Sequence, residues 1–238
     1  MIISARPFHW SFYAFFPVTL LMLFLDSSWL WARGINGQAL NNVLVPLYLY
    51  AMVRTMPDEG LKKIMLLTVP VSAVGEVILS MGIDLYTYKF GYVPIYVPFG
   101  HAIVIGSGFQ ILWRTGIHER AGAIISGFLA AYLSLFLGVF WVFGDTFTAL
   151  LGLLFFLGVF AMRQRVIYMF MPLFVLFVEF VGTAFGCWVW SPKPFGFLST
   201  TNPPMGSIMF YVYLDILVMV LGGVWAANRW TKTEHRIA

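Results

Sequence analysis

Acidic residues inside apolar stretches are the chemically notable feature of this sequence. Asp26, Glu76, Asp84, Glu179 and Asp215 lie within or at the ends of long hydrophobic runs, and Glu76 and Glu179 lie deepest. A carboxyl group in hydrocarbon is costly and usually faces a cavity or a partner. Lys and Arg are absent from the deep parts of these runs. We therefore expect the buried carboxyls to stay protonated, because desolvation disfavours the charged form. A protonated carboxylic acid in an apolar pocket is a good general acid.

Three of these residues are the candidate catalytic set: Glu76, Glu179 and Asp215. Glu76 or Glu179 would be the acid. Asp215, in the pattern Tyr211-x-Tyr213-x-Asp215, would be the base or would stabilise a cation. The competing interpretation is that the three carboxyls only form hydrogen bonds between helices.

Aromatic and polar residues near these acids are the predicted substrate-binding wall. The predicted wall residues are Asp26, Asp84, Tyr86, Tyr88, His101, Trp188, Trp190 and Asn202. Aromatic faces stabilise cations and also bind flat apolar ligands. The same aromatics would equally serve as anchors at a membrane interface, and Asp84 and His101 could simply meet headgroups and water.

A metal centre is a weaker interpretation. His101 with Glu76, Glu179 and Asp215 would be a mixed ligand set suited to iron, zinc or manganese. However, the chain has four histidines, and His118 and His235 lie on the opposite side of the predicted bundle. We predict no metal and no cofactor. Phosphate-loop, nucleophile-elbow and dinucleotide-binding motifs are also absent from the sequence.

Composition defines the class of protein that must position these residues. Of the 238 residues, 61% are hydrophobic and 10% are charged, against about 45–50% and about 25% in soluble domains. This excludes a soluble enzyme and a disordered chain, and the single cysteine, Cys187, excludes a disulfide scaffold. The net charge is +4, but the basic residues lie between apolar runs, where they set membrane topology; we expect no nucleic acid partner.

We predict an all-α, polytopic transmembrane bundle that forms a single domain over residues 1–238. Eight apolar runs are long enough to be spans, at about 12–32, 40–55, 63–84, 99–116, 121–143, 146–162, 166–189 and 206–228. The second and sixth runs are short, so seven spans is the alternative.

The distribution of Lys and Arg predicts the orientation of the bundle. With eight spans, three basic residues fall on one side: Arg33, Lys89 and Lys193. Eleven fall on the other: Arg6, Arg54, Lys62, Lys63, Arg114, Arg120, Arg163, Arg165, Arg229, Lys232 and Arg236. The basic side of a membrane protein faces the cytoplasm. We therefore expect an integral protein of a bacterial inner membrane with both termini in the cytoplasm.

The two halves of the chain resemble each other, which predicts a tandem 4+4 repeat with units at about 12–116 and 121–228. The first half runs Pro70, Glu76, Tyr86-Thr-Tyr88 and Pro98-Phe-Gly-His101. The second runs Pro172, Glu179, Trp188-Val-Trp190 and Pro204-Met-Gly-Ser207. An even number of spans in each unit makes the repeat parallel.

The deep Glu, followed by Gly, paired aromatics and a proline-containing loop, resembles membrane carotenoid-biosynthesis proteins of the hydratase type. A Glu in an early span and the final Tyr211-x-Tyr213-x-Asp215 are similar to integral-membrane terpene cyclases. The resemblance covers about a third of the chain and implies a helical membrane protein that handles isoprenoid chains, with Glu76 and Asp215 as an acid pair. The sequence departs from the cyclases at Gly75, where they have a Trp before the Glu, and in its eight predicted spans where seven are usual.

The leading functional expectation is an integral-membrane enzyme that acts on a lipophilic, isoprenoid substrate. The reaction would be an acid-initiated cyclisation, isomerisation or hydration, as in a membrane terpenoid or carotenoid cyclase, isomerase or hydratase. One alternative is a non-catalytic subunit or assembly factor of a larger membrane complex that binds lipid or pigment. A second alternative is a proton-coupled transporter. The expected partners are a lipophilic small molecule and membrane lipids, with a homo-oligomer or membrane complex possible.

Overall fold

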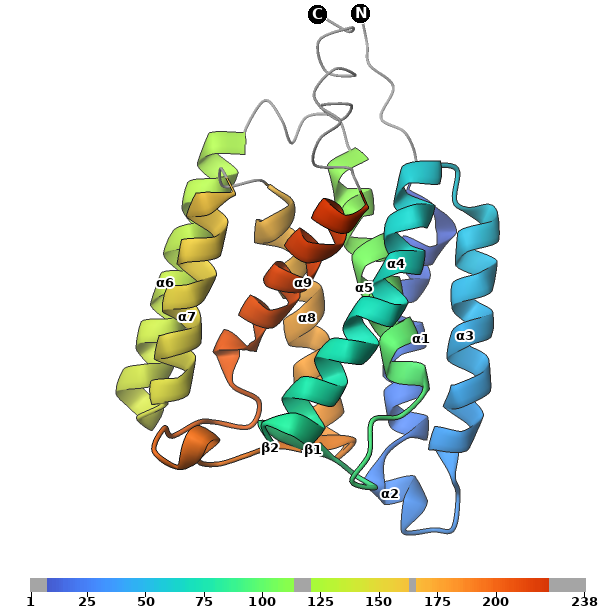
Figure 1. The fold of residues 1–238 in the computed structure, drawn as a ribbon, viewed down its shortest axis with the longest axis horizontal. Helices are drawn as coiled ribbons and strands as arrows, with labels where there is room; N and C mark the ends of the chain where they lie inside the picture. The colour runs from blue at the N-terminus through green and yellow to red at the C-terminus, as the bar shows by residue number, and fades with distance from the viewer. Residues whose placement is uncertain (1–7, 114–120, 163–165, 223–238) are drawn as a thin grey trace, which may run out of the picture.

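The chain forms a helical bundle closed at one end by a small sheet (Figure 1). The structure, a computed structural model, describes residues 8–113, 121–162 and 166–222. Within these residues, eight helices have fourteen or more residues, and one further helix has four. The architecture is therefore all-α, as the sequence predicts.

The first half of the chain contains α1 (Trp10–Leu25), α2 (Ser28–Trp31), α3 (Gly37–Thr55), α4 (Glu59–Glu76), β1 (Tyr86–Tyr88) and α5 (Tyr96–Phe109). The second half contains α6 (Ala121–Phe143), α7 (Thr146–Ala161), α8 (Ile167–Ala184), β2 (Trp188–Trp190) and α9 (Ile208–Leu221). A π-helical segment, Val77–Gly82, continues α4, and short 3-10 turns follow at Gln110–Trp113, Pro194–Gly196 and Met205–Ser207. Each predicted apolar run overlaps one long helix.

Polar caps explain where several helices begin. Asn36 accepts a hydrogen bond from the backbone of Ala39 at 3.1 Å and starts α3. Asp58 starts α4, and Asp145 starts α7 by accepting from the Thr148 backbone at 2.6 Å. Such side chains satisfy backbone donors that the first helical turn leaves unpaired. The breaks between apolar runs are therefore encoded locally.

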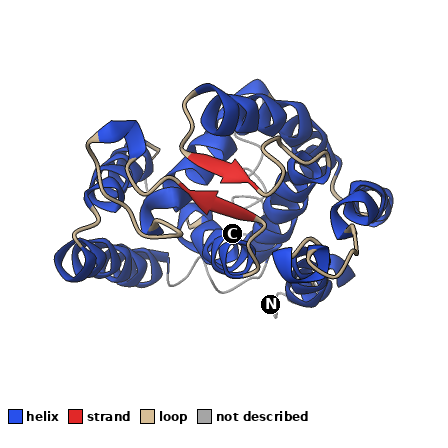
Figure 2. Cartoon of the chain, turned by 90° about the horizontal axis from the view of Figure 1, so that it is seen from below, coloured by secondary structure: helices blue, strands red, loops and turns tan. Residues whose placement is uncertain are grey.

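Four helices form the centre of the bundle, and two pairs flank it. Helices α4 and α5 pack on each other and meet α9 and α8, which also pack together. Helices α1 and α3 lie on the α5 side, and α6 and α7 lie on the other side against α9 and α8 (Figure 1). Figure 2 shows the two strands crossing one end of the bundle.

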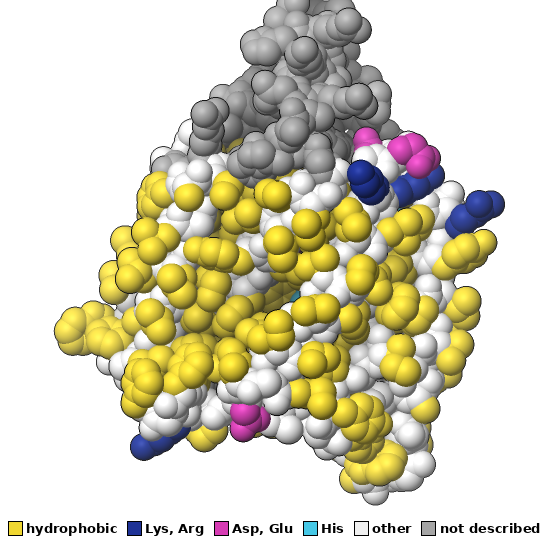
Figure 3. Space-filling model, viewed as in Figure 1, with side chains coloured by type: hydrophobic (Ala, Val, Ile, Leu, Met, Phe, Trp, Pro, Cys, Tyr) yellow, Lys and Arg dark blue, Asp and Glu magenta, His cyan; other side chains and the backbone are white. Residues whose placement is uncertain are grey.

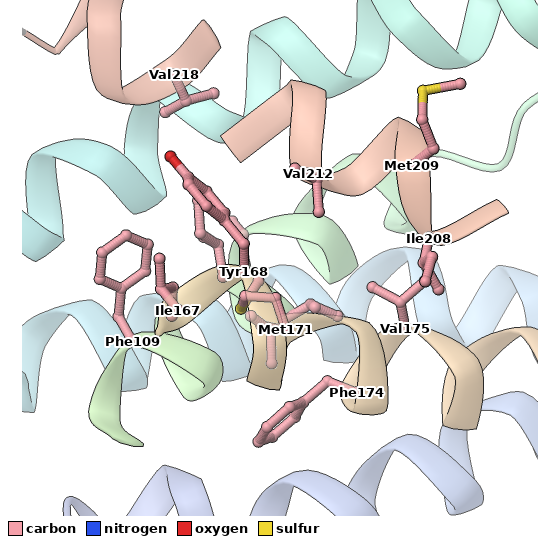
Figure 4. Packing of buried hydrophobic residues seen from close by; sticks show 14 of the residues in the cluster. Phe109, Ile167, Tyr168, Met171, Phe174, Val175, Ile208, Met209, Val212 and Val218 are labelled. Carbon is pink, nitrogen blue, oxygen red and sulfur yellow. The ribbon is translucent and has the colours of Figure 1, made fainter. Parts of the chain in front are cut away.

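Small residues and close side-chain contacts define the central helix packing. Figure 4 shows Met171 and Val175 of α8 near Val212 and Ile208 of α9. All four residues are buried. At Gly108 of α5, an added Cβ would overlap the sulfur of Met171, so this glycine allows the two helices to approach. Close approach at small residues is typical of helix packing in membranes.

The outer surface is largely apolar, which is compatible with a membrane location. Hydrophobic side chains cover most of the face in Figure 3. Four helical segments are long and apolar enough to cross a membrane: Trp10–Trp31, Glu59–Gly82, Gly122–Phe143 and Ile167–Ala184. Thr146–Ala161 and Met205–Leu221 are apolar but shorter. The surface of this protein is therefore suited to hydrocarbon along several of its helices.

The basic residues that the structure describes are divided between the two ends of the bundle. Arg54, Lys62 and Lys63 lie at the junction of α3 and α4, whereas Arg33, Lys89 and Lys193 lie in loops near the sheet. Eight further predicted topology residues lie outside the described residues: Arg6, Arg114, Arg120, Arg163, Arg165, Arg229, Lys232 and Arg236. His118 and His235 also lie outside them.

Candidate active site

The two aromatic pairs belong to strands β1 and β2, which were not predicted from the sequence. The strands pair antiparallel, with Tyr86 opposite Trp190 and Tyr88 opposite Trp188. These four side chains are buried, while the intervening residues point outward. Since alternate residues of a strand face opposite sides, the pairing directs all four aromatic side chains into the bundle.

Glu76 is surrounded by hydrogen-bond donors. Its Oε2 accepts from the hydroxyls of Tyr86 at 2.7 Å and Tyr88 at 2.6 Å. Its Oε1 lies 2.7 Å from Nε2 of His101 on α5. Burial, together with the neighbouring Glu76 charge, raises the pKa of both phenols well above their ordinary value. Both tyrosines therefore remain protonated and can donate to the carboxylate.

Glu179 occupies a similar place on α8 but has different partners. Its Oε2 accepts from the indole nitrogens of Trp188 at 3.1 Å and Trp190 at 3.0 Å. Its Oε1 has a longer contact, 3.4 Å, with the hydroxyl of Tyr211 on α9. The Tyr211 ring also stacks on His101, with ring centroids 4.9 Å apart. Tyr211 therefore contacts Glu179 directly and contacts Glu76 through His101.

Both glutamates line one cavity. Its volume is about 1010 Å³, at the upper end of the roughly 300–1,000 Å³ typical of ligand sites. Most of its wall is aliphatic or aromatic and comes from α1, α3, α4, α5, α8 and α9. The polar groups are concentrated where the two strands meet the helices. The site therefore combines a long apolar chamber with two carboxyl groups.

The cavity reaches the outer surface between α4 and α9. Its wall includes Val74 and Ile78 on the α4 side and Leu217 and Leu221 on α9. These side chains are exposed, Val74 by 61% and Leu221 by 57%. Figure 3 shows this apolar face hollowed between the two helices. An apolar molecule in the bilayer would meet the opening without passing through water.

Seven of the predicted site residues line this cavity, and four do not. Those that line it are Glu76, Tyr86, Tyr88, His101, Glu179, Trp188 and Trp190. Asp26, Asp84, Asn202 and Asp215 are outside the lining. Asp215 is only 2% exposed, and its Oδ2 has no hydrogen-bond partner among the described residues. Asp215 is therefore not part of the cavity wall that the two glutamates share.

Asp26 forms a buried ion pair. Its Oδ1 lies 2.8 Å from the ammonium of Lys89, and its Oδ2 accepts from the Tyr96 hydroxyl at 2.7 Å. The expectation that the membrane acids lack cationic neighbours is therefore wrong at Asp26, because Lys89 reaches it from the loop after β1. Together these contacts fasten that loop to the end of α1.

The other two predicted residues lie at the strands. Asp84 is exposed and has a positive φ of 52° just before β1. Asn202 accepts a hydrogen bond from the backbone N–H of Trp190 at 3.1 Å, which ties the loop after β2 to the end of that strand. Neither residue is among those that line the cavity.

Sequence reasoning did not include Tyr211, Lys89, Tyr96 or Asp145 among the site residues. Asp145 is buried and accepts hydrogen bonds from Thr148 and from the Thr201 backbone, which holds the loop after β2 against α7. A signal for the strands was present, because Tyr-Thr-Tyr and Trp-Val-Trp place their aromatics at every second residue.

Within the described ranges, no group of three or more His, Cys, Asp or Glu side chains is placed to hold a metal ion. The polar groups in the cavity wall include carboxyl, imidazole, phenol and indole groups. Comparisons of the chain with protein-family models, with curated proteins and with solved structures find no match.

Proposed function

We propose that this protein is an integral-membrane enzyme that acts on a lipophilic, isoprenoid substrate. The reaction would begin by protonation of a carbon–carbon double bond and end as a cyclisation, isomerisation or hydration. The observation that carries the proposal is a large apolar cavity with two carboxyl groups in its wall. Interhelical packing alone would not require such a chamber next to both acids.

The substrate class follows from the wall of the cavity. Hydrocarbon side chains make up most of it, and exposed residues of α4 and α9 form its rim, so the ligand would come from the bilayer. Tyr86, Tyr88, Trp188 and Trp190 place aromatic rings beside the acids. Ring faces stabilise cations. A polyunsaturated chain that passes through a carbocation matches both properties.

The proposed reaction is balanced in protons. One carboxylic acid gives its proton to an alkene carbon, which forms a C–H bond and leaves a cation on the neighbouring carbon. In a cyclisation or isomerisation, the cation later loses a proton to a carboxylate. In a hydration, water attacks the cation and the carboxylate takes one of the water protons. Each route uses a proton donor and a proton acceptor in one chamber.

We also propose that all eight long helices cross the membrane as two four-helix units related by an axis along the membrane normal. Each glutamate accepts hydrogen bonds from the aromatic pair of its own unit. The first aromatic residue of each strand lies opposite the last aromatic residue of the other strand, as a two-fold axis requires. The contacts of α4 with α9 and of α5 with α8 fit the same relation. Both termini would lie in the cytoplasm of a bacterial cell, with the strands at the outer face.

Labelling with a membrane-impermeant maleimide tests this topology. Glu59→Cys lies at one end of the bundle, and Lys193→Cys lies at the other. We expect intact cells to label Lys193→Cys and to label Glu59→Cys only after permeabilisation. Phe143→Cys, at the end of α6, should label from outside if α6 and α7 both cross. The reverse pattern would contradict the orientation.

Lipid extraction and mass spectrometry test the proposed enzyme. Cells with the wild-type protein should contain an isoprenoid product that is missing from cells without it. Glu76→Gln and Glu179→Gln should abolish the product. Gly138→Ala is the matched control, because Gly138 lies on α6 with open space around its Cβ position. An isoprenoid profile that is the same in every strain would refute the proposal.

A second candidate is a lipid- or pigment-binding subunit of a membrane complex. It is favoured by the hydrogen bonds within the protein that both carboxyls already make, since such bonds would also hold helices together. Purified protein distinguishes the two functions. A bound lipid that is chemically the same in wild type and in Glu179→Gln would support the binding function, whereas a substrate that accumulates only in the variant would support the enzyme.

A further inference from the structure

We infer that the two glutamates have different roles: Glu179 is the proton donor, and Glu76 together with His101 holds the negative charge that faces the cation. This inference rests on the proposed function, because it assigns steps of that reaction. It goes beyond that function by separating two carboxyls that occupy matching places in the sequence. The evidence is the kind and number of hydrogen bonds that each carboxyl accepts.

The environment of Glu76 stabilises a carboxylate. Two phenol hydroxyls bond to its Oε2, and His101 bonds to its Oε1, all within 2.7 Å. Three short hydrogen bonds to the charged form favour it over the neutral acid. The Nδ1 atom of His101 is buried without a hydrogen-bond partner among the described residues. A neutral imidazole that donates Nε2–H to Glu76 leaves only a lone pair at Nδ1, whereas a charged one would leave an unpaired N–H.

The proton between Glu76 and His101 is therefore held within the pair. A neutral imidazole does not give its Nε2 proton to a carboxylate, because that would leave an imidazolate anion, so the proton stays on His101 and Glu76 stays a carboxylate. Glu76 is thus poorly placed to release a proton into the cavity. It is well placed to attract a nearby cation and to receive the proton that the cation loses.

The environment of Glu179 leaves one oxygen available for a proton. An indole nitrogen can only donate, so both Trp188 and Trp190 must bond to lone pairs, and both bond to Oε2. The contact of Oε1 with the Tyr211 hydroxyl, 3.4 Å, exceeds the usual range for O–H···O bonds of roughly 2.5–3.0 Å. The acid proton can therefore reside on Oε1, and no strong hydrogen bond holds it there.

The residue that matches His101 in the second half explains the difference. The elements Pro98-Phe-Gly-His101 and Pro204-Met-Gly-Ser207 correspond in the predicted repeat, so Glu179 has a serine where Glu76 has a histidine. Ser207 lines the cavity and is buried, and its hydroxyl has no hydrogen-bond partner among the described residues. In the described part of the chain, no hydrogen bond joins Ser207 to Glu179, so Glu179 lacks the third short hydrogen bond that His101 gives to Glu76.

The roles connect into one cycle. Glu179 transfers its Oε1 proton to the alkene and becomes a carboxylate, which the two indole N–H groups stabilise through Oε2. The cation forms between the aromatic side chains of the strands. The Glu76–His101 pair accepts the proton that the cation releases, and exchange with water returns each group to its starting state. Tyr211 acts as a positioning residue, because it stacks on His101 and contacts Glu179.

Infrared spectroscopy of the purified protein in lipid tests the assignment without a substrate. A protonated carboxylic acid has a C=O stretch that is separate from the carboxylate bands and shifts in D₂O. We expect Glu179→Gln to remove one such band and Glu76→Gln to leave it in place. Asp215→Asn identifies the contribution of the other buried acid. If the protonated-carboxyl band that we assign to Glu179 were lost in Glu76→Gln and kept in Glu179→Gln, the inference would be overturned.

His101→Ala provides a second measurement that does not depend on either Gln variant. Without the imidazole, Glu76 loses one of its three donors, and we expect a new protonated-carboxyl band to appear. An unchanged spectrum would overturn the role of His101. These spectra do not depend on turnover, so they are distinguishable from the lipid profile, which alone decides whether the protein is an enzyme.

Discussion

Replacement of Gly182 by alanine should disconnect Trp188 from Glu179. Gly182 lies on α8 three residues after Glu179, and a Cβ built there would overlap the six-membered ring of Trp188. The indole is buried, is attached to β2 and packs edge-on against Tyr88. It must therefore move. Its Nε1–Oε2 distance of 3.1 Å is already near the long end of the usual range, so a shift of about 1 Å breaks the hydrogen bond.

Three effects set the size of the change. Overpacking of a buried site costs about 1–3 kcal/mol, and loss of the hydrogen bond costs about 0.5–1.5 kcal/mol. The higher helix propensity of alanine returns up to about 1 kcal/mol. We expect the free energy of unfolding to fall by about 1–3 kcal/mol, with a parallel loss of product because Glu179 keeps only one indole donor.

Thermal unfolding in detergent and the lipid profile measure the two consequences. Gly138→Ala is the control, since it makes the same change on an exposed part of α6 and should keep the wild-type Tm. Wild-type stability and wild-type product in Gly182→Ala would refute the reasoning, because it would mean that the Trp188–Glu179 contact does not depend on this glycine.

Four further outcomes are expected. Lys89→Met leaves Asp26 charged and buried, which should cost about 3–5 kcal/mol in a denaturation assay, and addition of Asp26→Asn should recover most of the loss. Asp145→Ala removes the cap of α7 and should lower the free energy of unfolding by about 2 kcal/mol; an unchanged Tm would contradict this. Burial raises the pKa of the Cys187 thiol, so maleimide should react at neutral pH only after unfolding, and rapid labelling of the folded protein would disprove it. Asp215→Asn should keep the product in the lipid profile, because Asp215 is outside the cavity lining; loss of product would instead support Asp215 as the base.

The helices were predictable from the sequence because their signal is local. Runs of about twenty apolar residues, interrupted at capping residues such as Asp58 and Asp145, coincide with the observed helices. The number of membrane-crossing helices is harder to obtain from the sequence than the helices themselves. Helices α5, α7 and α9 are shorter than 18 residues, and α3 is long enough but contains Gln38, Asn41 and Asn42, so length and composition select only four candidates.

The strands and the ion pair were not predicted, because they depend on partners far away in the chain. Tyr86–Tyr88 is only three residues long and gains its strand geometry from Trp188–Trp190. Lys89 lies in a loop, and nothing in its neighbourhood indicates that it turns back to Asp26. The apolar run at 206–228 predicts that Asp215 lies within a span, but it does not say which neighbouring helix the Asp215 side chain faces.

The pairing of β1 with β2 has a consequence for biosynthesis. The partner of Tyr86 is Trp190, about one hundred residues later in the chain. At the usual synthesis rate of roughly 5–20 residues per second, the edge of β1 stays unpaired for about 5–20 s before β2 has been synthesised. Unpaired strand edges are prone to join other chains. Ribosome pausing in the second half should therefore increase aggregation of this protein, while slow elongation of the first half should have little effect.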